Sequence, residues 1–378
     1  MALAALPLWM GCAPGDSDAP ESQAPVFHPT FLTILEETPS TPHLAFGEVG
    51  GIVLQADGTL AILDRMAAEV RVVDMEGRLV RTVGRRGQGP GEFSGELTLG
   101  LLATPDDGLA LPDLDRGVVV IFRPDGTPGD AVPWDVANHF IPEWRPLSTP
   151  GSAAARAVAD STEHLIRLEL PGAGGLAGDT LATLPRIRQP PTAAEPRWPL
   201  LMDRWVWDVR ENRAVAAQTS RAEILLYDDG QPTGSVSWDH VPAPVTDTQV
   251  EDLLRVVART QGSPGEVPAE LRARMLPPEQ LHAVADLRLG PGGLILVQRL
   301  RPTSEMDRRI LSAFGARGLG GRIWDLFSWE GERLGVLEFP SNVELFQILG
   351  DTLVGVLEGG LDVQRVFVAT LPEGLPDS

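Results

Sequence analysis

The chain has 378 residues, a formal net charge of −21 and 43% hydrophobic residues, enough apolar sequence for one large folded domain. The negative charge excludes binding to nucleic acid and docking on an anionic lipid surface by charge alone, because both need basic protein surface. All 31 basic residues are arginine. This excludes Schiff-base catalysis and Walker-type phosphate binding, because both need a lysine amine.

A short apolar run at the start of the chain ends in Gly11-Cys12, and a polar, proline-rich stretch follows it. This pattern resembles the end of a bacterial lipoprotein signal peptide. The resemblance predicts a signal segment and flexible tether over 1–25 and a lipid on Cys12. It places the protein on the periplasmic side of the bacterial cell envelope, with Ala13 favouring the outer over the inner membrane. The alternative is an apolar N-terminus that contains a cysteine by chance.

Short strands joined by glycine turns are expected after the tether. An apolar run followed by an acidic residue and a glycine recurs at Gly77, Gly126, Gly230 and Gly331. The spacing fits a unit of about 50 residues, the length of a four-stranded propeller blade. Because Asp-Gly and Glu-Gly supply the positive φ of tight hairpins, these turns are expected between the third and fourth strands of a blade.

A second set of turns, at 56–58, 105–108 and 290–293, is expected to join the first and second strands of a blade. We therefore predict an all-β fold over 26–378, a six-bladed β-propeller. The strand at 31–35 is expected to complete the last blade, so that the two ends of the chain close the ring and leave no open sheet edge. The predicted blades lie near 44–83, 97–134, 147–185, 198–240, 284–340 and 343–372.

The glycine-rich stretch 84–93, GRRGQGPGEF, crosses from the first blade to the second. Its glycines allow the sharp crossing, and Phe93 is expected to fill the space between the two blades. The stretch resembles a loop of NHL-repeat-like propellers, especially exported bacterial six-bladed propellers, many of which are lipoproteins. Trp324-Asp325-Leu326-Phe327 resembles a late blade of the same group. This resemblance implies the fold and no particular activity.

The first candidate ligand contacts follow the second strands of the first two blades. Asp64-Arg65 predicts a local ion pair at a strand end, with a ligand contact at the mouth of the ring as the alternative. Asp113, Asp115 and Arg116 form a second polar patch. Its alternating carboxylates would suit a hard cation such as Ca²⁺, but no nearby acidic residue completes the six oxygens that Ca²⁺ needs. A hairpin turn with solvated acids is the favoured interpretation.

Three tryptophans, Trp198, Trp205 and Trp207, alternate with other residues as in a strand. Trp205 and Trp207 share one face, which predicts packing between blades, with a sugar-stacking platform as the alternative. Helical spacing then replaces the strand pattern over 246–282, with Asp247 as a plausible N-cap and a second helix near Pro268–Met275. This helical insertion between blades 4 and 5 is expected to pack on one face of the ring.

No motif for a catalytic residue or a metal centre is present in the sequence. The chain is therefore interpreted as a monomeric binding scaffold for a small molecule or an envelope protein, with no cofactor and with the membrane reached only through the lipid. The alternative is a metal-dependent propeller hydrolase or lyase of the lactonase type. The chain has only three asparagines, Asn138, Asn212 and Asn342, and no evident set of metal ligands on the inner strands. A subunit of an envelope assembly is the third interpretation.

Overall fold

Six sheets stand radially around a central channel in the computed structural model. It describes residues 24–95, 97–133, 140–147, 152–158, 162–169, 179–187, 198–240, 244–260, 266–306, 319–359 and 363–375, so Cys12 lies outside the described residues. The predicted six-bladed β-propeller is confirmed. Among the described residues, six of the seven buried apolar clusters lie between neighbouring blades, so each blade hides its faces against the next.

Every blade contains four antiparallel strands, and the first strand of each lies beside the channel. Blades 1 to 3 consist of β3 (Val49–Leu54), β4 (Leu60–Asp64), β5 (Glu69–Val73) and β6 (Leu79–Val83); β9 (Leu102–Ala103), β10 (Leu109–Asp113), β11 (Val118–Phe122) and β12 (Val132–Pro133); and β13 (Phe140–Pro146), β14 (Ser152–Val158), β15 (Thr162–Glu169) and β16 (Thr180–Pro185).

The second half of the ring has the same plan. Blades 4 to 6 consist of β18 (Trp205–Arg210), β19 (Arg213–Gln218), β20 (Glu223–Asp228) and β21 (Gln231–Ser237); β23 (Asp286–Leu289), β24 (Ile295–Leu300), β25 (Gly320–Phe327) and β26 (Arg333–Glu338); and β27 (Val343–Leu349), β28 (Thr352–Glu358), β29 (Gln364–Thr370) and β2 (Thr30–Leu35). Short 3-10 helices lie at Pro42–Leu44, Pro291–Gly293 and Thr303–Glu305.

The ring closes as predicted, because β2 pairs antiparallel with β29 and becomes the outer strand of blade 6. Just before it, β1 (Val26–Phe27) pairs in parallel with β26 of blade 5. The N-terminal segment therefore contacts two neighbouring blades.

The predicted hairpin turns lie where the repeat places them. Gly77, Gly126, Gly230 and Gly331 all have positive φ, between 76° and 91°, and each follows the third strand of its blade. In the first turn of blade 2 the positive φ belongs to Asp107, at 66°, rather than to Gly108. Aspartate tolerates this region better than most side chains, so the turn keeps its geometry.

The glycine-rich crossing carries two short strands, β7 (Arg85–Arg86) and β8 (Glu92–Phe93), which pair in parallel. Phe93 is fully buried in the cluster between blades 1 and 2, as predicted. Gly84 has a φ of 79°, and a Cβ there would collide with the ring of Phe93. Glycine at position 84 is therefore required by both backbone and packing.

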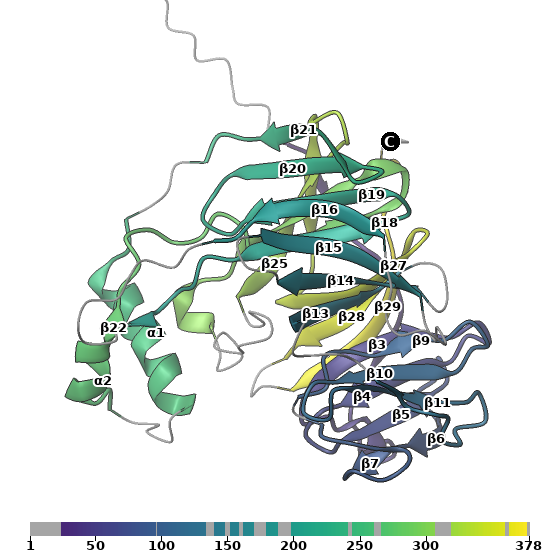
Figure 1. Cartoon of the computed structure of the whole chain (residues 1–378). Coiled ribbons are helices and arrows are strands. Elements are labelled where there is room, and N and C mark those ends of the chain that lie inside the picture. The colour runs from purple at the N-terminus through teal and green to yellow at the C-terminus, as the bar shows by residue number, and fades with distance from the viewer. Residues whose placement is uncertain are drawn as a thin grey trace, which may run out of the picture.

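The helical insertion contains α1 (Asp247–Thr260), α2 (Ala269–Arg274) and β22 (Met275–Leu276), and it stands to one side of the ring in Figure 1. Thr246 and Gln249, rather than Asp247, form the N-terminal cap, since each backbone amide donates to the other's side chain. Among the described residues, no helix has both the length and the apolar character needed to cross a membrane.

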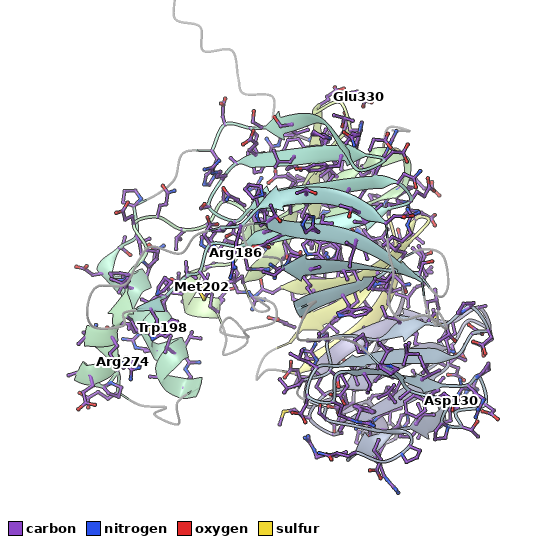
Figure 2. The ribbon with its side chains drawn as sticks, viewed as in Figure 1. Asp130, Arg186, Trp198, Met202, Arg274 and Glu330 are labelled. Carbon is purple, nitrogen blue, oxygen red and sulfur yellow. The ribbon has the colours of Figure 1, made fainter. Side chains whose placement is uncertain are left out.

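Two predicted blade boundaries are wrong. Blade 3 begins at Phe140 rather than at 147, because β13 contains prolines and charged residues that do not predict a strand. Trp198 lies in β17 (Trp198–Pro199), which pairs with β22 of the insertion and is not part of blade 4. Trp198 is 55% exposed, and nearby Met202 is 54% exposed (Figure 2).

Candidate functional site

A cavity occupies one end of the central channel, and we call it the channel cavity. It encloses about 910 Å³, open solvent included, and each of the six blades contributes residues on or beside its innermost strand. Residues on or after second strands, and Gly320 at the start of β25, complete it. The lining residues are Gly50, Gly51, Ile52, Arg65, Leu99, Gly100, Leu101, Glu143, Trp144, Arg145, Pro146, Arg204, Ala285, Asp286, Arg288, Gln298, Arg301, Gly320, Val343, Glu344, Phe346 and Glu358.

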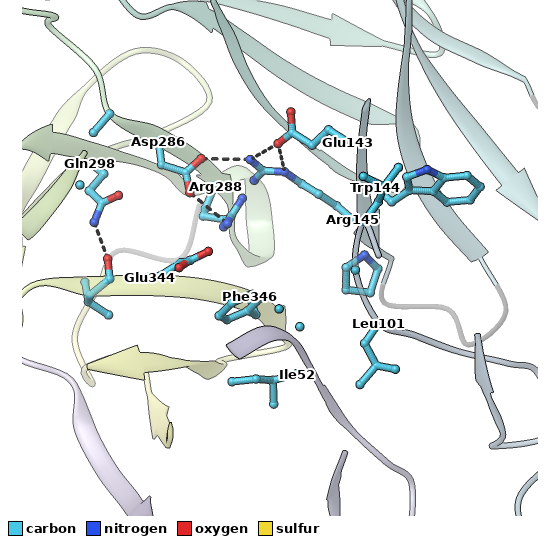
Figure 3. Close-up of a pocket in the computed structure, with 18 of the residues that line it drawn as sticks. Ile52, Leu101, Glu143, Trp144, Arg145, Asp286, Arg288, Gln298, Glu344 and Phe346 are labelled. Atoms are coloured by element: carbon cyan, nitrogen blue, oxygen red, sulfur yellow. Dashed lines mark hydrogen bonds and ion pairs between the residues drawn. The ribbon is translucent and has the colours of Figure 1, made fainter. Parts of the chain in front are cut away.

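Arg145 on β13 lies at the centre of a charged network across the channel (Figure 3). Its Nη2 lies 3.0 Å from Glu143 Oε1 and 3.0 Å from Asp286 Oδ1 of blade 5. Arg288 Nη2 lies 2.9 Å from Asp286 Oδ2. Trp207 donates from Nε1 to Glu143 Oε2 at 3.0 Å. These bonds link blades 3, 4 and 5 and hold the charged groups in fixed positions.

Burial and neighbouring charges compete in this network. Burial raises the pKa of Glu143, but Arg145, Arg156 and Arg204 outweigh it and hold the pKa below its usual value. Burial also raises the pKa of Asp286, and Arg145 offsets only part of that rise. The pKa of Arg204 is lowered by burial, which outweighs the attraction of Glu143 and Asp286. Arg204 therefore stands in a place where negative charge would stabilise its cation.

A smaller cavity occupies the other side of the channel. It shares Arg145, Pro146, Arg288 and Phe346 with the channel cavity, so these four residues form the partition between the two. Asp208 lines the smaller cavity and accepts a hydrogen bond from the Leu289 amide at 2.8 Å. Burial raises the pKa of Asp208 to about 6, despite the opposing charge of Arg145.

A groove adjoins the channel cavity at Arg301, and we call it the side groove. It encloses about 1610 Å³, open solvent included. Arg301 lines both cavities; its Nη1 lies 2.5 Å from Glu358 Oε2, and its Nε donates to the Gly320 carbonyl at 2.7 Å. The other lining residues of the side groove are Trp238, Asp239, His240, Leu281, His282, Ala283, Arg299, Leu300, Pro302, Asp325 and Arg333.

His282 is buried in the wall of the side groove, and burial lowers its pKa to about 4, which Arg204 reinforces and Asp203 opposes. The folded chain therefore keeps His282 neutral where an unfolded chain would protonate it. Its contribution to stability is complete above pH 6.5 and is lost as the pH falls through about 4.

We expect His282→Gln to remove this dependence. Between pH 7 and pH 4 the free energy of unfolding of the wild type should fall relative to the variant by up to about 3 kcal/mol. Urea unfolding at a series of pH values measures it, with His240→Gln, an exposed histidine of the same groove, as the control. Identical pH profiles for wild type and His282→Gln would contradict the interpretation.

Asp64 and Arg65, the first predicted pair, have different partners in the structure. Asp64 is buried and accepts hydrogen bonds from the backbone amides of Gly47, Met66 and Ala67. Its ion-pair partner is Arg71, at 3.3 Å. Arg65 instead lies 3.4 Å from Glu48, and it lines the channel cavity. Asp64 thus holds a turn, while Arg65 faces the channel.

The second predicted patch lies outside the lining of the channel cavity. Asp113 is fully buried and accepts bonds from the Ser94 amide and hydroxyl, both at 2.8 Å, so the expectation of a solvated acid is wrong for this residue. Asp115 is exposed, as expected. Arg116 donates to the backbone carbonyl of Glu92. Asp113 and Arg116 therefore attach the glycine-rich crossing to blade 2.

Trp205 and Trp207 are buried between blades 3 and 4, so the predicted packing role is confirmed.

Among the described residues, no three His, Cys, Asp or Glu side chains gather closely enough to hold a metal ion.

Sequence reasoning missed the central charged residues of the cavity. Glu143 and Arg145 lie on β13, which was not predicted as a strand, and Asp286 and Arg288 lie on a short inner strand with no motif. The available signal was charge placed at alternate positions of inner strands, at 143 and 145 and again at 286 and 288.

No family model matches the chain, and no curated protein matches its sequence. A solved member of the DUF4221 family from Bacteroides vulgatus matches with a TM-score of 0.51 at 9% identity, over 90% of this chain and 96% of that one. A Bacteroides fragilis protein described as exported has a TM-score of 0.46 at 13% identity, covering 92% and 99%. The calcium-binding protein regucalcin of Agrobacterium tumefaciens has a TM-score of 0.43 at 10% identity, covering 92% and 96%. At these identities the likeness establishes the fold alone.

Proposed function

We propose that this chain is an exported propeller, tethered to a bacterial membrane by a lipid on Cys12, that binds a small ligand in the channel cavity. The observation that carries the proposal is the convergence of charged side chains from different blades on one cavity. If the side chains in the channel served only to hold the blades together, we would expect them to be apolar, because burying charge is costly. Concave sites with a few convergent polar groups are where small ligands bind.

The tether is proposed from the N-terminal pattern, in which Gly11 precedes the lone Cys12 after an apolar run. The outer membrane is proposed over the inner on the strength of Ala13. Expression of the full chain in a Gram-negative host with an alkyne-labelled palmitate tests this. Label that appears on the wild type and disappears in Cys12→Ser supports the lipid, and equal labelling contradicts it.

Binding is tested by the shift in melting temperature of the purified chain with a panel of named compounds: small carboxylates, monosaccharides, inorganic phosphate, Ca²⁺ and Zn²⁺. At least one organic compound should raise Tm for the wild type and for Arg78→Gln, an exposed arginine, and fail to do so for Arg204→Gln. Shifts that Arg204→Gln leaves unchanged for every compound contradict the channel cavity as the site. Stoichiometric Ca²⁺ or Zn²⁺ in the purified protein would instead favour the metal-dependent hydrolase or lyase.

A further inference from the structure

The charge of the channel cavity differs from that of the protein around it. The whole chain has 52 acidic and 31 basic residues. In the cavity lining the excess is basic instead, because its basic residues are Arg65, Arg145, Arg204, Arg288 and Arg301 and its acidic residues are Glu143, Asp286, Glu344 and Glu358. A strongly acidic protein has thus gathered guanidinium groups at one concave place. Such a place attracts a small anion that the rest of the surface repels.

Arg288 offers a specific contact for that anion. Its side chain is 10% exposed, it is paired with Asp286, and it also donates to the Leu345 carbonyl. Its Nε has no hydrogen-bond partner among the described residues. A buried guanidinium N–H without an acceptor is costly, so we expect the Arg288 side chain to turn on binding until one of its N–H groups meets a carboxylate oxygen. Arg204 lines the same cavity, and the lowering of its pKa by burial would be relieved by an anion.

The lining also limits the charge of the ligand. It carries five cationic and four acidic side chains, so one further negative charge brings it to balance. A second negative charge would have no cation of the lining left to offset it. This favours a single carboxylate over the dianion of phosphate. Guanidinium donors match the two oxygens of a carboxylate.

The side groove offers a place for the rest of such a molecule. Its lining includes Trp238, Leu281, Leu300 and Pro302, which supply apolar surface beside the shared residue Arg301. A molecule that is held by its carboxylate in the channel cavity and passes Arg301 would lay an apolar body against Trp238. Burial of that body would add affinity in proportion to the apolar area removed from water.

Building on the proposed function, we infer that the ligand is a small organic acid with one carboxylate and an apolar body. The carboxylate is bound by Arg204 and Arg288 in the channel cavity, and the body lies in the side groove.

Calorimetric titration of the chain at about pH 8.5, where phosphate is a dianion, and at constant ionic strength tests the inference with four probes: acetate, hexanoate, the neutral hexanamide and inorganic phosphate. Hexanoate should bind roughly tenfold more tightly than acetate, because burying two of its additional methylene groups gives about that gain. Hexanamide should bind at least about tenfold more weakly than hexanoate, because it loses a charge-assisted hydrogen bond. Phosphate should also bind at least about tenfold more weakly, because its second charge is left unbalanced.

Variants test the contacts of the carboxylate and of the apolar body one at a time. Arg204→Gln should weaken hexanoate binding about tenfold. Glu344→Gln, which removes a negative charge from the lining, should strengthen hexanoate binding about threefold. Trp238→Ala should reduce hexanoate to the affinity of acetate and leave acetate unchanged, while Trp198→Ala, an exposed tryptophan outside the groove, changes neither. Unaltered melting temperatures identify variants that remain folded.

The inference that the ligand is an anion is wrong if hexanamide binds as tightly as hexanoate. It is also wrong if Glu344→Gln binds hexanoate no more tightly than the wild type does. The placement of the apolar body in the side groove is wrong if Trp238→Ala still binds hexanoate more tightly than acetate. Absence of hexanoate binding overturns the ligand class as a whole. In each case the proposed function survives if another compound of the panel still requires Arg204, so the two failures can be told apart.

Discussion

A chain that begins at Glu36 is expected to lose the closed ring, whereas a chain that begins at Ala24 keeps it. The shorter chain lacks β2, which pairs with β29 from Thr30 to Leu35. Phe31 packs edge-on against Phe367 with ring centroids 5.5 Å apart, and Leu35 is 4% exposed. Losing these apolar contacts and the ladder hydrogen bonds costs about 5 kcal/mol or more, which is comparable with the whole stability of many domains.

Urea unfolding and size-exclusion chromatography of the two chains measure this effect. The chain from Glu36 should unfold at a much lower urea concentration and should self-associate, because β29 becomes an open sheet edge. A synthetic peptide of residues 24–37 added in excess should restore stability, since it supplies the missing strand. Equal urea midpoints for the two chains would show that blade 6 is stable without β2.

Arg145→Leu is expected to destabilise the protein by about 3–5 kcal/mol at pH 8, because removing one member of a buried ion-pair network leaves the other charges uncompensated. The acids left behind are Glu143, Asp208 and Asp286, all within 4 Å of Arg145 in the wild type. Arg78→Leu, at an exposed ion pair, should change stability by less than about 1 kcal/mol.

The pH dependence of the variant distinguishes charge from packing. The pKa values of Asp208 and Asp286 already lie above their unfolded values, and without Arg145 they rise further. Acids of this kind contribute stability that is present at low pH and is lost as the pH rises through the folded pKa. The deficit of Arg145→Leu should therefore be smaller at pH 5 than at pH 8. A deficit of the same size at both would mean that the side chain acts by filling space.

The architecture could be predicted because it follows from local chemistry that repeats. The acidic-glycine turns require positive φ wherever they occur, and their spacing gives the size of the blade. Phe93 and the strand at 31–35 were also correctly placed, because a fully apolar side chain after a glycine crossing and an unpaired strand at the chain end each have one favourable position in a ring. The error with the greatest consequence was β13, where Glu143 and Arg145 lie between prolines and do not resemble a buried strand.

The sequence by itself therefore determined the repeat, the number of blades, the closure of the ring and the position of the helical insertion. The channel cavity was decided only by the tertiary structure. Arg145 and Asp286 are far apart in the chain and lie 3.0 Å apart in space, and Asp64 and Arg65 are adjacent in the chain but have different partners. Turns depend on neighbours in sequence, whereas the partners of a charged side chain depend on which inner strands the closed ring brings together.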